Sequence, residues 1–393
     1  MSKKKFGLLL GFMAFSFLSL IIVVGLEVNN YFNPRENKSI VNVEDMENDT
    51  DPIDPDSLAS AREEEGDSGI DEDTTEELTQ SELSLLFAGD VLLSDYLLNL
   101  YDKDDNKLSG IISNELLDIM TSSDVLMVNQ EFPFSNRGTK ADDKQFTFRV
   151  NPNRVDILSE MGIDIVTLAN NHTLDYGQDA LLDTLDTLDR VNIRHVGAGR
   201  NLKEAKELVS TRYLDKNIAF LGASRVIPVY EWNAFTDTPG LFTTYDPALL
   251  LEEIKKAKLT HDIVVVYVHW GEERSEFPKD YQRKMGKQYI DAGADIVIGA
   301  HPHVLQGIEY HKGKPIIYSL GNFIFGSGSF QTMLLKAQIA QDGNVSISLI
   351  PCQTEAGFTS LKDKKQWKEF HKYMEQISPN ITIDEYGAVS EKE

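Results

Sequence analysis

Hydrophobic residues in this chain of 393 residues follow two spacings, and polar residues mark where each pattern stops. Short β-branched runs bounded by polar residues predict strands. Longer stretches with apolar residues every three or four positions predict helices. The predicted strands are 83–90, 124–131, 164–171, 217–224, 262–271 and 294–303. The helices predicted between them are 153–162, 177–191, 246–259 and 278–293.

This alternation of strands and helices predicts an α/β fold with a largely parallel sheet. After His303 the pattern becomes β-rich, with runs at 314–325, 333–341 and 344–351. Asp342-Gly343 between the last two runs predicts a two-residue hairpin loop. We therefore expect a second sheet that packs on the first. The amphipathic stretch 361–378 predicts a final helix, and the residues after it are expected to be loose.

The N-terminal stretch is apolar. Phe6 to Leu26 is a run of 21 residues without a charge, preceded by three lysines. That length spans a bilayer as a helix, and the lysines place the N-terminus in the cytoplasm. A cleaved signal peptide is the alternative, but the run is long for one and no small-x-small cleavage site follows it. We expect residues 1–26 to form a cytoplasmic stub and an uncleaved, single-pass anchor in the cell membrane, with the rest of the chain extracellular.

Charge and cysteine content define the other segments. Residues 27–82 hold 19 acidic and three basic residues, so −16 of the net charge of −25 lies there. This composition predicts a disordered linker. We expect a folded domain over 83–362 and a helix with a tail over 363–393. The acidic balance argues against a nucleic-acid partner. The single cysteine, Cys352, excludes an intrachain disulfide and a cysteine-metal site, and we expect it to be inert and buried.

Polar residues of metal-ligand type stand at the ends of five predicted strands. In open α/β sheets the carboxyl ends of the strands form the edge at which ligands bind. Each residue alone is more often a cap, but five such ends together predict a metal centre. A mixed imidazole and carboxylate shell suits Mn, Fe or Zn. The residues are Asp90, then Asn129 and Glu131, then Asn170, Asn171 and His172, then His269 and Glu272, then His301 and His303.

Several nearby residues allow two interpretations. Asp175 could orient His172 or cap the next helix. Glu272 could be a base, a ligand or a solvated loop residue, and Asn322 could contact substrate or form a strand bulge. Trp270 is expected to form a wall of the site. The candidates for substrate contact are Asn129, Asn170, Trp270, Glu272 and Asn322.

Five motifs, in their order along the chain, carry a resemblance to a known family. They are FAGDVLL, LANNHTLDYG, HWGEE, GAHPHVLQG and YSLGNFIF, and the similarity runs from about Leu85 to Pro351. The chain resembles the CapA family of bacterial capsule synthesis proteins, which includes the membrane-anchored subunit of poly-γ-glutamate synthesis and export complexes. That family is similar to calcineurin-like metallophosphoesterases, whose fold is a four-layer αββα sandwich. The resemblance implies the plasma membrane, membrane subunits of a capsule polymer complex and an anionic polymer as partners.

The phosphoesterase pattern also implies roles for individual residues. It makes His172 a proton donor beside the metal, with Asp175 as its candidate orienting group. Asn129 is an alternative to Glu131 as the carboxylate or carboxamide that would bridge two metals. Pro302 would stiffen the turn that carries the paired histidines. The implied metal ligands are Asp90, Glu131, Asn171, His269, His301 and His303.

One position departs from that pattern. The phosphoesterase motif Asp-x-His reads here Asp90-Val91-Leu92, and leucine cannot ligate. We therefore expect one tight metal site and a weaker second one. The tight site would hold Glu131, Asn171, His269 and His301, and the weaker one Asp90, Glu131 and His303. The leading hypothesis is a capsule polymer synthesis or export protein; the alternatives are a metal-dependent phosphodiesterase or polymer-cleaving hydrolase, and a surface interaction module with a degenerate site.

Overall fold

The computed structural model describes residues 83–392 except 104, 106, 143 and 214. The predicted anchor and the acidic linker lie outside the described residues. Within the described residues, no helix combines the length and the apolar character that a membrane crossing requires.

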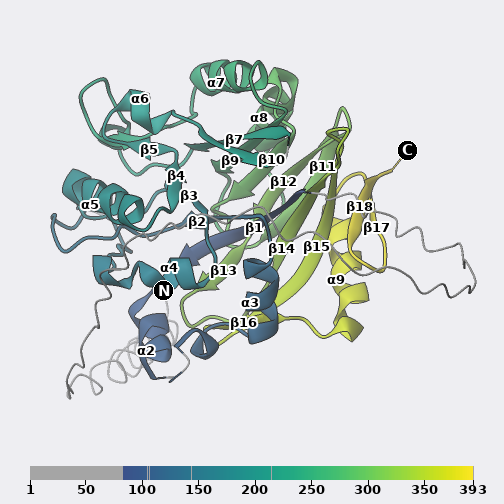
Figure 1. The fold of residues 1–393 in the computed structure, drawn as a ribbon, viewed down its shortest axis with the longest axis horizontal. Helices are drawn as coiled ribbons and strands as arrows, with labels where there is room; N and C mark the ends of the chain where they lie inside the picture. The colour runs from purple at the N-terminus through teal and green to yellow at the C-terminus, as the bar shows by residue number, and fades with distance from the viewer. Residues whose placement is uncertain (1–82, 104, 106, 143, 214, 393) are drawn as a thin grey trace, which may run out of the picture. The chain divides into compact units, whose positions relative to one another are not determined.

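Two large sheets form the centre of the described chain (Figure 1). The first sheet has the order β17-β18-β15-β14-β1-β2-β3-β4, with β13 beside β1 and β16 beside β15. Its strands are β1 Leu83–Leu92, β2 Val125–Gln130, β3 Ile165–Thr167, β4 Arg194–Val196, β13 Asn322–Phe325, β14 Phe330–Ile339, β15 Val345–Glu355, β16 Phe358–Leu361, β17 Ile381–Ile383 and β18 Ala388–Glu391.

The second sheet has the order β11-β12-β10-β9-β7-β6. Neighbouring strands run parallel from β7 through β9 and β10 to β12, and the two edge strands are antiparallel. Its strands are β6 Val209–Tyr213, β7 Lys216–Ser224, β9 Ile263–His269, β10 Ile296–Ala300, β11 Leu305–His311 and β12 Lys314–Leu320. A small separate pair joins β5 Ala198–Gly199 to β8 Gly240–Leu241.

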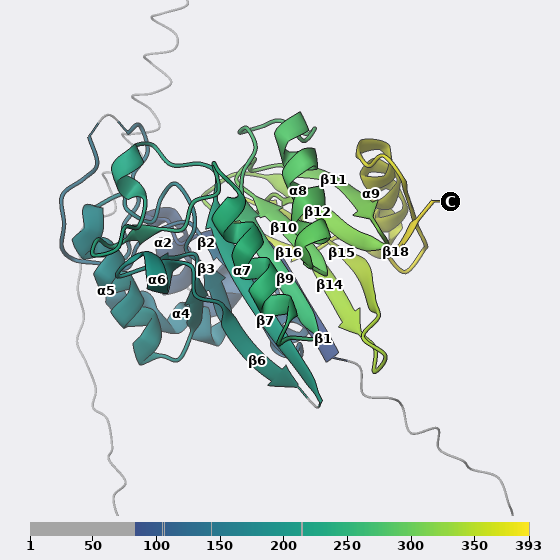
Figure 2. The same ribbon diagram turned by 90° about the horizontal axis from the view of Figure 1, so that it is seen from above.

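Helices cover the outer face of each sheet, so the domain has four layers (Figure 2). Helices α2 to α5 pack with the first sheet in one apolar cluster, and α7 and α8 pack with the second sheet in another. A third cluster lies between the sheets. The helices are α2 Asp95–Lys103, α3 Asn114–Thr121, α4 Asp156–Glu160, α5 Gly177–Arg190, α6 Leu202–Ala205, α7 Ala248–Lys258, α8 Asp280–Ala292 and α9 Lys364–Ile377.

Strand β9 shows why this sequence forms a central strand. All seven of its residues are buried. Ile263, Val265 and Tyr267 belong to the cluster between the sheets, whereas Val264, Val266 and Val268 belong to the cluster beneath α7 and α8. A parallel strand that is buried on both faces requires such a continuous apolar run, because successive side chains point to opposite faces.

The expectation of a second sheet packed on the first is confirmed, but the late strands do not form that sheet by themselves. The late strands β14 and β15 join the first sheet next to β1, and β11 and β12 join the second sheet next to β10. The run 314–325 is two strands in different sheets, because the chain turns at Gly321 with φ of 67°. Hydrophobic periodicity identifies a strand, but it does not identify the neighbour with which that strand pairs.

Three smaller predictions also need correction. The 164–171 run is a strand only over Ile165–Thr167. The loop between the paired residues Ile339 and Val345 has five residues rather than two, and within it the Gly343 N–H donates to the Ala340 carbonyl with φ of 85°. The residues after the final helix are not loose, because β17 and β18 pair with each other and β18 pairs with β15.

Candidate metal centre

The predicted strand-end residues come together where the two sheets meet. Asp90 lies near the end of β1, and Glu131 directly follows β2. His269 is the last residue of β9, and His301 directly follows β10. The site is therefore built from the carboxyl ends of parallel strands in both sheets.

Asp90, Glu131 and His303 form the first compact group. One ligand atom from each lies within 4.8 Å of the others, and the Asp90 Oδ2 to His303 Nδ1 distance is 3.3 Å. Asn129 Nδ2 donates to Asp90 Oδ1 at 2.8 Å and to Glu131 Oε1 at 3.0 Å. This carboxamide holds the two carboxylates close together in spite of their mutual repulsion.

His269 and Asn171 extend this group towards the second sheet. His269 Nε2 lies 2.8 Å from Asn171 Oδ1 and 3.6 Å from Glu131 Oε1. The rings of His269 and His301 are 4.7 Å apart, centre to centre. The four residues predicted for the tight site therefore lie side by side, and they share Glu131 with the first group.

Three buried polar atoms of the site have no hydrogen-bond partner among the described residues: Asp90 Oδ2, Glu131 Oε2 and His301 Nδ1. Buried polar atoms are nearly always satisfied, so unsatisfied ones indicate a missing partner. All three atoms are of a type that binds divalent metals. The residues present therefore fit a metal ion, and the structure does not identify which ion.

The electrostatics of the site support the same conclusion. Burial and the neighbouring Asp90 raise the pKa of Glu131 well above its usual value. Although burial alone would lower it, the carboxylates of Glu131 and Asp90 raise the pKa of His303 to about 10. Burial, together with His303, lowers the pKa of His301 to about 4. The carboxylates thus favour a cation between them, and His301 is neutral, the form in which imidazole binds metal.

The backbone around the paired histidines is strained. His301 has φ of 99° and His303 has φ of 58°, and residues other than glycine rarely adopt such positive φ angles. The loop after β9 holds this turn, since Arg274 N–H donates to the Pro302 carbonyl at 2.7 Å. Strain that the surrounding structure maintains is common where geometry serves function.

A second polar cluster lies beside the metal group. His172 Nδ1 is 2.8 Å from Asp175 Oδ2, and the Phe148 N–H donates to the same carboxylate oxygen at 2.7 Å. Asp175 is fully buried, and α5 begins at Gly177 without a side-chain cap. The structure therefore favours the orienting role of Asp175 over the capping role.

Sequence reasoning missed Lys144. Its ammonium donates to the Asn171 carbonyl and to Asp175, and it lies 3.0 Å from His172 Nδ1. Although Asp175 raises it, burial lowers the pKa of Lys144 overall. No motif marks Lys144, because it belongs to a polar loop that reaches these partners only through the tertiary structure.

Glu273 was missed as well. A Glu273 oxygen and one nitrogen each of His301 and His303 lie within 4.8 Å of one another. The sequence analysis names the neighbouring Glu272 instead, but that residue is exposed and pairs with Lys279. The HWGEE motif contains both residues, and only the turn at Gly271 decides which carboxylate faces the histidines.

The structure shows the surroundings of three residues that were predicted to contact substrate. Asn322 Oδ1 lies 2.8 Å from His303 Nδ1 at a bulge in the β1–β13 pairing, so it orients a candidate ligand. Asn170 is fully buried, and its Nδ2 donates to Asn129 Oδ1 and to the Gln130 carbonyl. Trp270 does not form a wall of the site, because it packs between Tyr289 and Tyr318 in the core beneath α8.

The fold and the site define a four-layer α/β protein with a candidate metal centre between its two sheets. Comparison with known proteins identifies its family. Residues 84–327 match the bacterial capsule synthesis protein family PGA_cap, and the chain belongs to that family.

Named relatives agree with this assignment. The chain is 35% identical to the PGA biosynthesis protein CapA of Bacillus subtilis, over 68% of this chain and 71% of the relative. It is 31% identical to the capsule biosynthesis protein CapA of Bacillus anthracis, over 72% and 71%. Among solved structures, TT1561 of Thermus thermophilus aligns at 9% identity with a TM-score of 0.38, over 68% of this chain and 99% of that protein.

Proposed function

We propose that this protein acts in the synthesis or export of an anionic capsule polymer of the poly-γ-glutamate type. It would be anchored in the cell membrane, with its metal-binding domain extracellular and with membrane subunits of the polymer complex as partners. Membership in the capsule synthesis family supports this proposal, and so do the names of the two Bacillus relatives. The anchor rests on the apolar run from Phe6 to Leu26.

One observation carries the role of the site. In the group of Asp90, Glu131 and the half-buried His303, two buried carboxylate oxygens accept no hydrogen bond from the described residues, and Asp90 Oδ2 has only its ion-pair contact with His303. Asp90, Glu131, Asn171, His269, His301 and His303 would hold a divalent ion. Such an ion, when bound, acts as a Lewis acid towards a carboxylate, carbonyl or phosphoryl oxygen. Asn129 keeps the carboxylates in place, and Asp175 fixes the ring of His172 at the edge of the group.

A metal-dependent hydrolase is the second candidate function. The His172–Asp175 pair favours it, since a metal with a purely structural role needs no oriented imidazole beside it. In a hydrolase, His172 would donate a proton to the leaving group. Leu92 weakens this candidate, because it is buried in an apolar cluster at the position where the phosphoesterase pattern has a histidine.

Capsule production tests the proposed function. A strain that lacks the gene would be complemented with the wild type, His301→Ala, His172→Ala or the remote control His311→Ala. His301→Ala should lose both metal and capsule polymer, and His311→Ala should restore both. Elemental analysis of the full-length chain gives the metal content. Normal capsule output from a metal-free His301→Ala chain would contradict the proposal.

The His172 variant separates the candidate functions. If the site is a hydrolase, His172→Ala keeps its metal and loses cleavage of a phosphodiester or of γ-linked glutamate polymer. The acid's contribution is commonly about 10² to 10⁴ in rate. If the site only grips polymer, His172→Ala supports full capsule output. Loss of metal from this variant would make His172 itself a ligand.

A further inference from the structure

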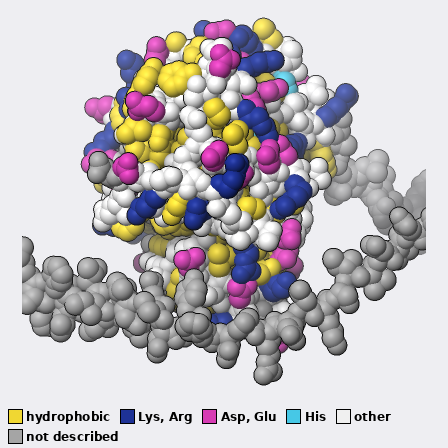
Figure 3. Space-filling view, turned by 90° about the vertical axis from the view of Figure 1, so that its left-hand side faces the viewer, with side chains coloured by type: hydrophobic (Ala, Val, Ile, Leu, Met, Phe, Trp, Pro, Cys, Tyr) yellow, Lys and Arg dark blue, Asp and Glu magenta, His cyan; other side chains and the backbone are white. Residues whose placement is uncertain are grey.

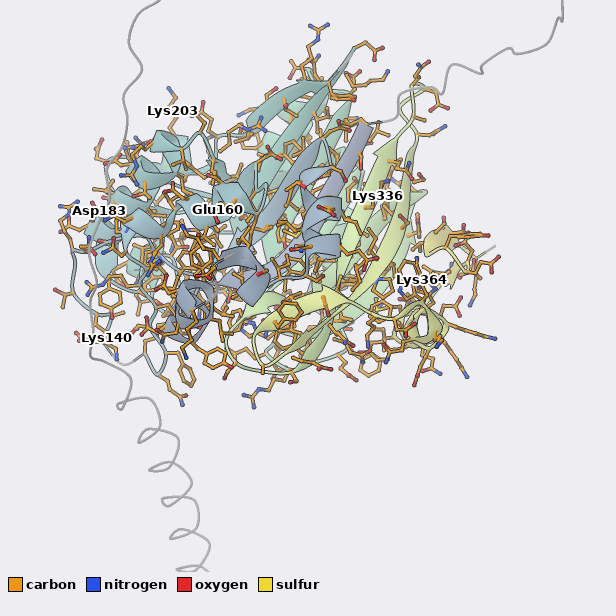
Figure 4. The ribbon with its side chains drawn as sticks, turned by 60° about the horizontal axis from the view of Figure 1, so that its bottom comes forward. Lys140, Glu160, Asp183, Lys203, Lys336 and Lys364 are labelled. Carbon is orange, nitrogen blue, oxygen red and sulfur yellow. The ribbon has the colours of Figure 1, made fainter. Side chains whose placement is uncertain are left out.

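Helix α9 carries a row of lysines on the side opposite its buried face. Trp367, Phe370, Met374 and Ile377 are buried against the sheets. Lys364, Lys365, Lys368 and Lys372 are exposed, and their spacing places them on one face of the helix. Figure 4 shows Lys364 projecting from α9 at the edge of the domain.

These lysines have no carboxylate partners. The structure shows no ion pair for them or for Lys362 within its described residues, whereas Lys206, Lys258 and Lys287 each pair with an acid. Segment 361–378 holds five lysines and three acids in a chain of net charge −25. Two of those acids are engaged, since Asp363 caps α9 and Glu375 accepts from the Ile383 N–H at 2.9 Å. The surface therefore has positive charge that the protein itself does not neutralise.

Another face of the domain carries mixed charges rather than mainly basic ones. Figure 3 shows the face of the domain that lies on the left in Figure 1, where Lys and Arg alternate with Asp and Glu. Arg137 with Asp183 and Arg200 with Asp186 are pairs of this kind. On α9, by contrast, four exposed lysines without an ion pair among the described residues share one face, with Glu369 as the nearby exposed carboxylate and with the Lys364 ammonium over the Trp367 ring.

A groove of about 460 Å³ adjoins the lysine row, between α9 and β14. Its polar lining offers amide, hydroxyl and ammonium groups and one carboxylate: Gln331, Gln366, Gln376, Tyr373, Lys362, Lys372 and Glu369. Carboxamides donate and accept hydrogen bonds, so they can pair with the amide groups of a polyamide. The ammonium groups can bind the carboxylates of a polyamide that carries them.

One residue of the groove contacts the loop that carries Glu273. The Tyr373 hydroxyl donates to Glu276 Oε1 at 3.2 Å, three residues beyond Glu273 in the chain. Helix α9 also packs on β11, the strand that begins just after His303. Helix α9 is therefore in contact with the loop and the strand that flank the candidate metal group.

We propose that the lysine face of α9 and the adjoining groove bind an anionic polyamide, the γ-linked glutamate polymer. The identity of the polymer rests on the proposed function; the basic face and the groove do not. An anionic membrane is the alternative partner for a basic helix. Membrane-binding helices insert an apolar face into lipid, and the apolar face of α9 is buried in the core.

The test compares two triple variants of the full-length chain with the same change of charge. Lys365→Glu, Lys368→Glu and Lys372→Glu alter the proposed surface. Lys203→Glu, Lys255→Glu and Lys284→Glu alter exposed lysines on α6, α7 and α8. Fluorescence anisotropy with labelled poly-γ-glutamate, at rising salt concentration, measures binding. The wild type and the control should bind equally and weaken with salt, and the α9 variant should bind about tenfold or more weakly.

Two further measurements keep the outcomes distinct. Equal binding by the α9 variant and the wild type overturns the inference and leaves the proposed function intact, because another surface would then hold the polymer. Absence of wild-type binding also overturns it, and the capsule complementation then decides the proposed function separately. Phosphatidylserine vesicles provide the membrane arm. If the wild type binds these vesicles but not the polymer, and the α9 variant loses vesicle binding, the face is assigned to lipid.

Discussion

At the scale of single residues, the site contains buried groups that are unfavourable without a bound partner. Glu131 and Asp90 are both fully buried carboxylates, and one carboxamide from Asn129 holds them. His301 has a left-handed backbone and an imidazole nitrogen without a partner among the described residues. Neither feature stabilises the fold of the metal-free chain. Both are explained if a bound cation supplies the missing interactions.

His301 allows strain and ligation to be separated. Both His301→Gly and His301→Ala should lose metal, since each removes the imidazole. Glycine adopts φ of 99° without steric strain, so metal-free His301→Gly should be more stable than metal-free His301→Ala by about 1 kcal/mol. Elemental analysis and urea unfolding measure the two effects. Equal stability of the two variants would show that the turn relaxes when the imidazole is removed.

Lys144 and Asp175 form an ion pair whose carboxylate is completely buried. Lys144→Met leaves the buried carboxylate with the Phe148 N–H and the His172 ring but without its ammonium partner, so it should reduce the free energy of unfolding by about 3 kcal/mol. The double variant Lys144→Met, Asp175→Asn should recover part of that loss, because no charge is then left alone. Urea denaturation of the four proteins gives the coupling energy. Additive losses would mean that the two residues act independently.

At the scale of elements, the site depends on the crossing of the chain from one sheet to the other. Strand β12 ends the second-sheet segment at Leu320, Gly321 turns, and β13 begins in the first sheet at Asn322. The Asp90 N–H donates to the Gly321 carbonyl at 2.9 Å, and this hydrogen bond connects β1 to the crossing. The candidate ligand Asp90 and Asn322, which contacts His303, are register partners across the same junction.

Gly89 tests the importance of this crossing. A Cβ at Gly89 would lie 1.8 Å from the Gly321 carbonyl oxygen, so the backbones of the two strands would have to separate. Gly89→Ala should destabilise the domain by more than about 3 kcal/mol and lower its metal content. Gly328→Ala is the matched control, since its Cβ would meet only ordinary contacts at 3.5 Å. Thermal unfolding of both variants is the measurement, and similar midpoints would contradict this account.

At the scale of the whole molecule, the four layers bring strands that are distant in the chain to one edge. β1 and β2 come from the first sheet, and β9 and β10 come from the second. Helix α9 belongs to the same domain, and its Tyr373 contacts Glu276 in the loop that follows β9. The proposed polymer-binding helix and the candidate metal centre are therefore parts of one domain, linked by this loop.

The membrane anchor is a prediction about the whole molecule. An uncleaved anchor keeps its first residues, so protein extracted from membranes should retain the segment before Phe6. Mass spectrometry of the N-terminal peptide tests this. Carbonate washing should leave the chain in the membrane fraction, because a helix of 21 apolar residues does not dissociate as a peripheral protein does. A mature N-terminus within residues 27–40 would indicate cleavage instead.

Much of the fold could be predicted from local sequence. The strands of both sheets that carry site residues were predicted, and so were α5, α7, α8 and α9, because their periodicity is strong and their ends carry polar residues. Cys352 was predicted to be inert, and it is fully buried with its pKa raised to about 12 by burial. The pairing of the late strands could not be predicted, since pairing depends on contacts between residues that are distant in the chain.

The amino-acid sequence by itself determined which residue types stand at the strand ends, and thereby the kind of chemistry at the site. Only the tertiary structure decided which of these side chains face one another. It selected Glu273 rather than Glu272 for the group with His301 and His303, brought Lys144 to Asp175, and placed Trp270 in the core. The physical reason is that strand ends follow from local periodicity, whereas the directions of side chains in loops follow from turns, close backbone contacts and the packing of two sheets.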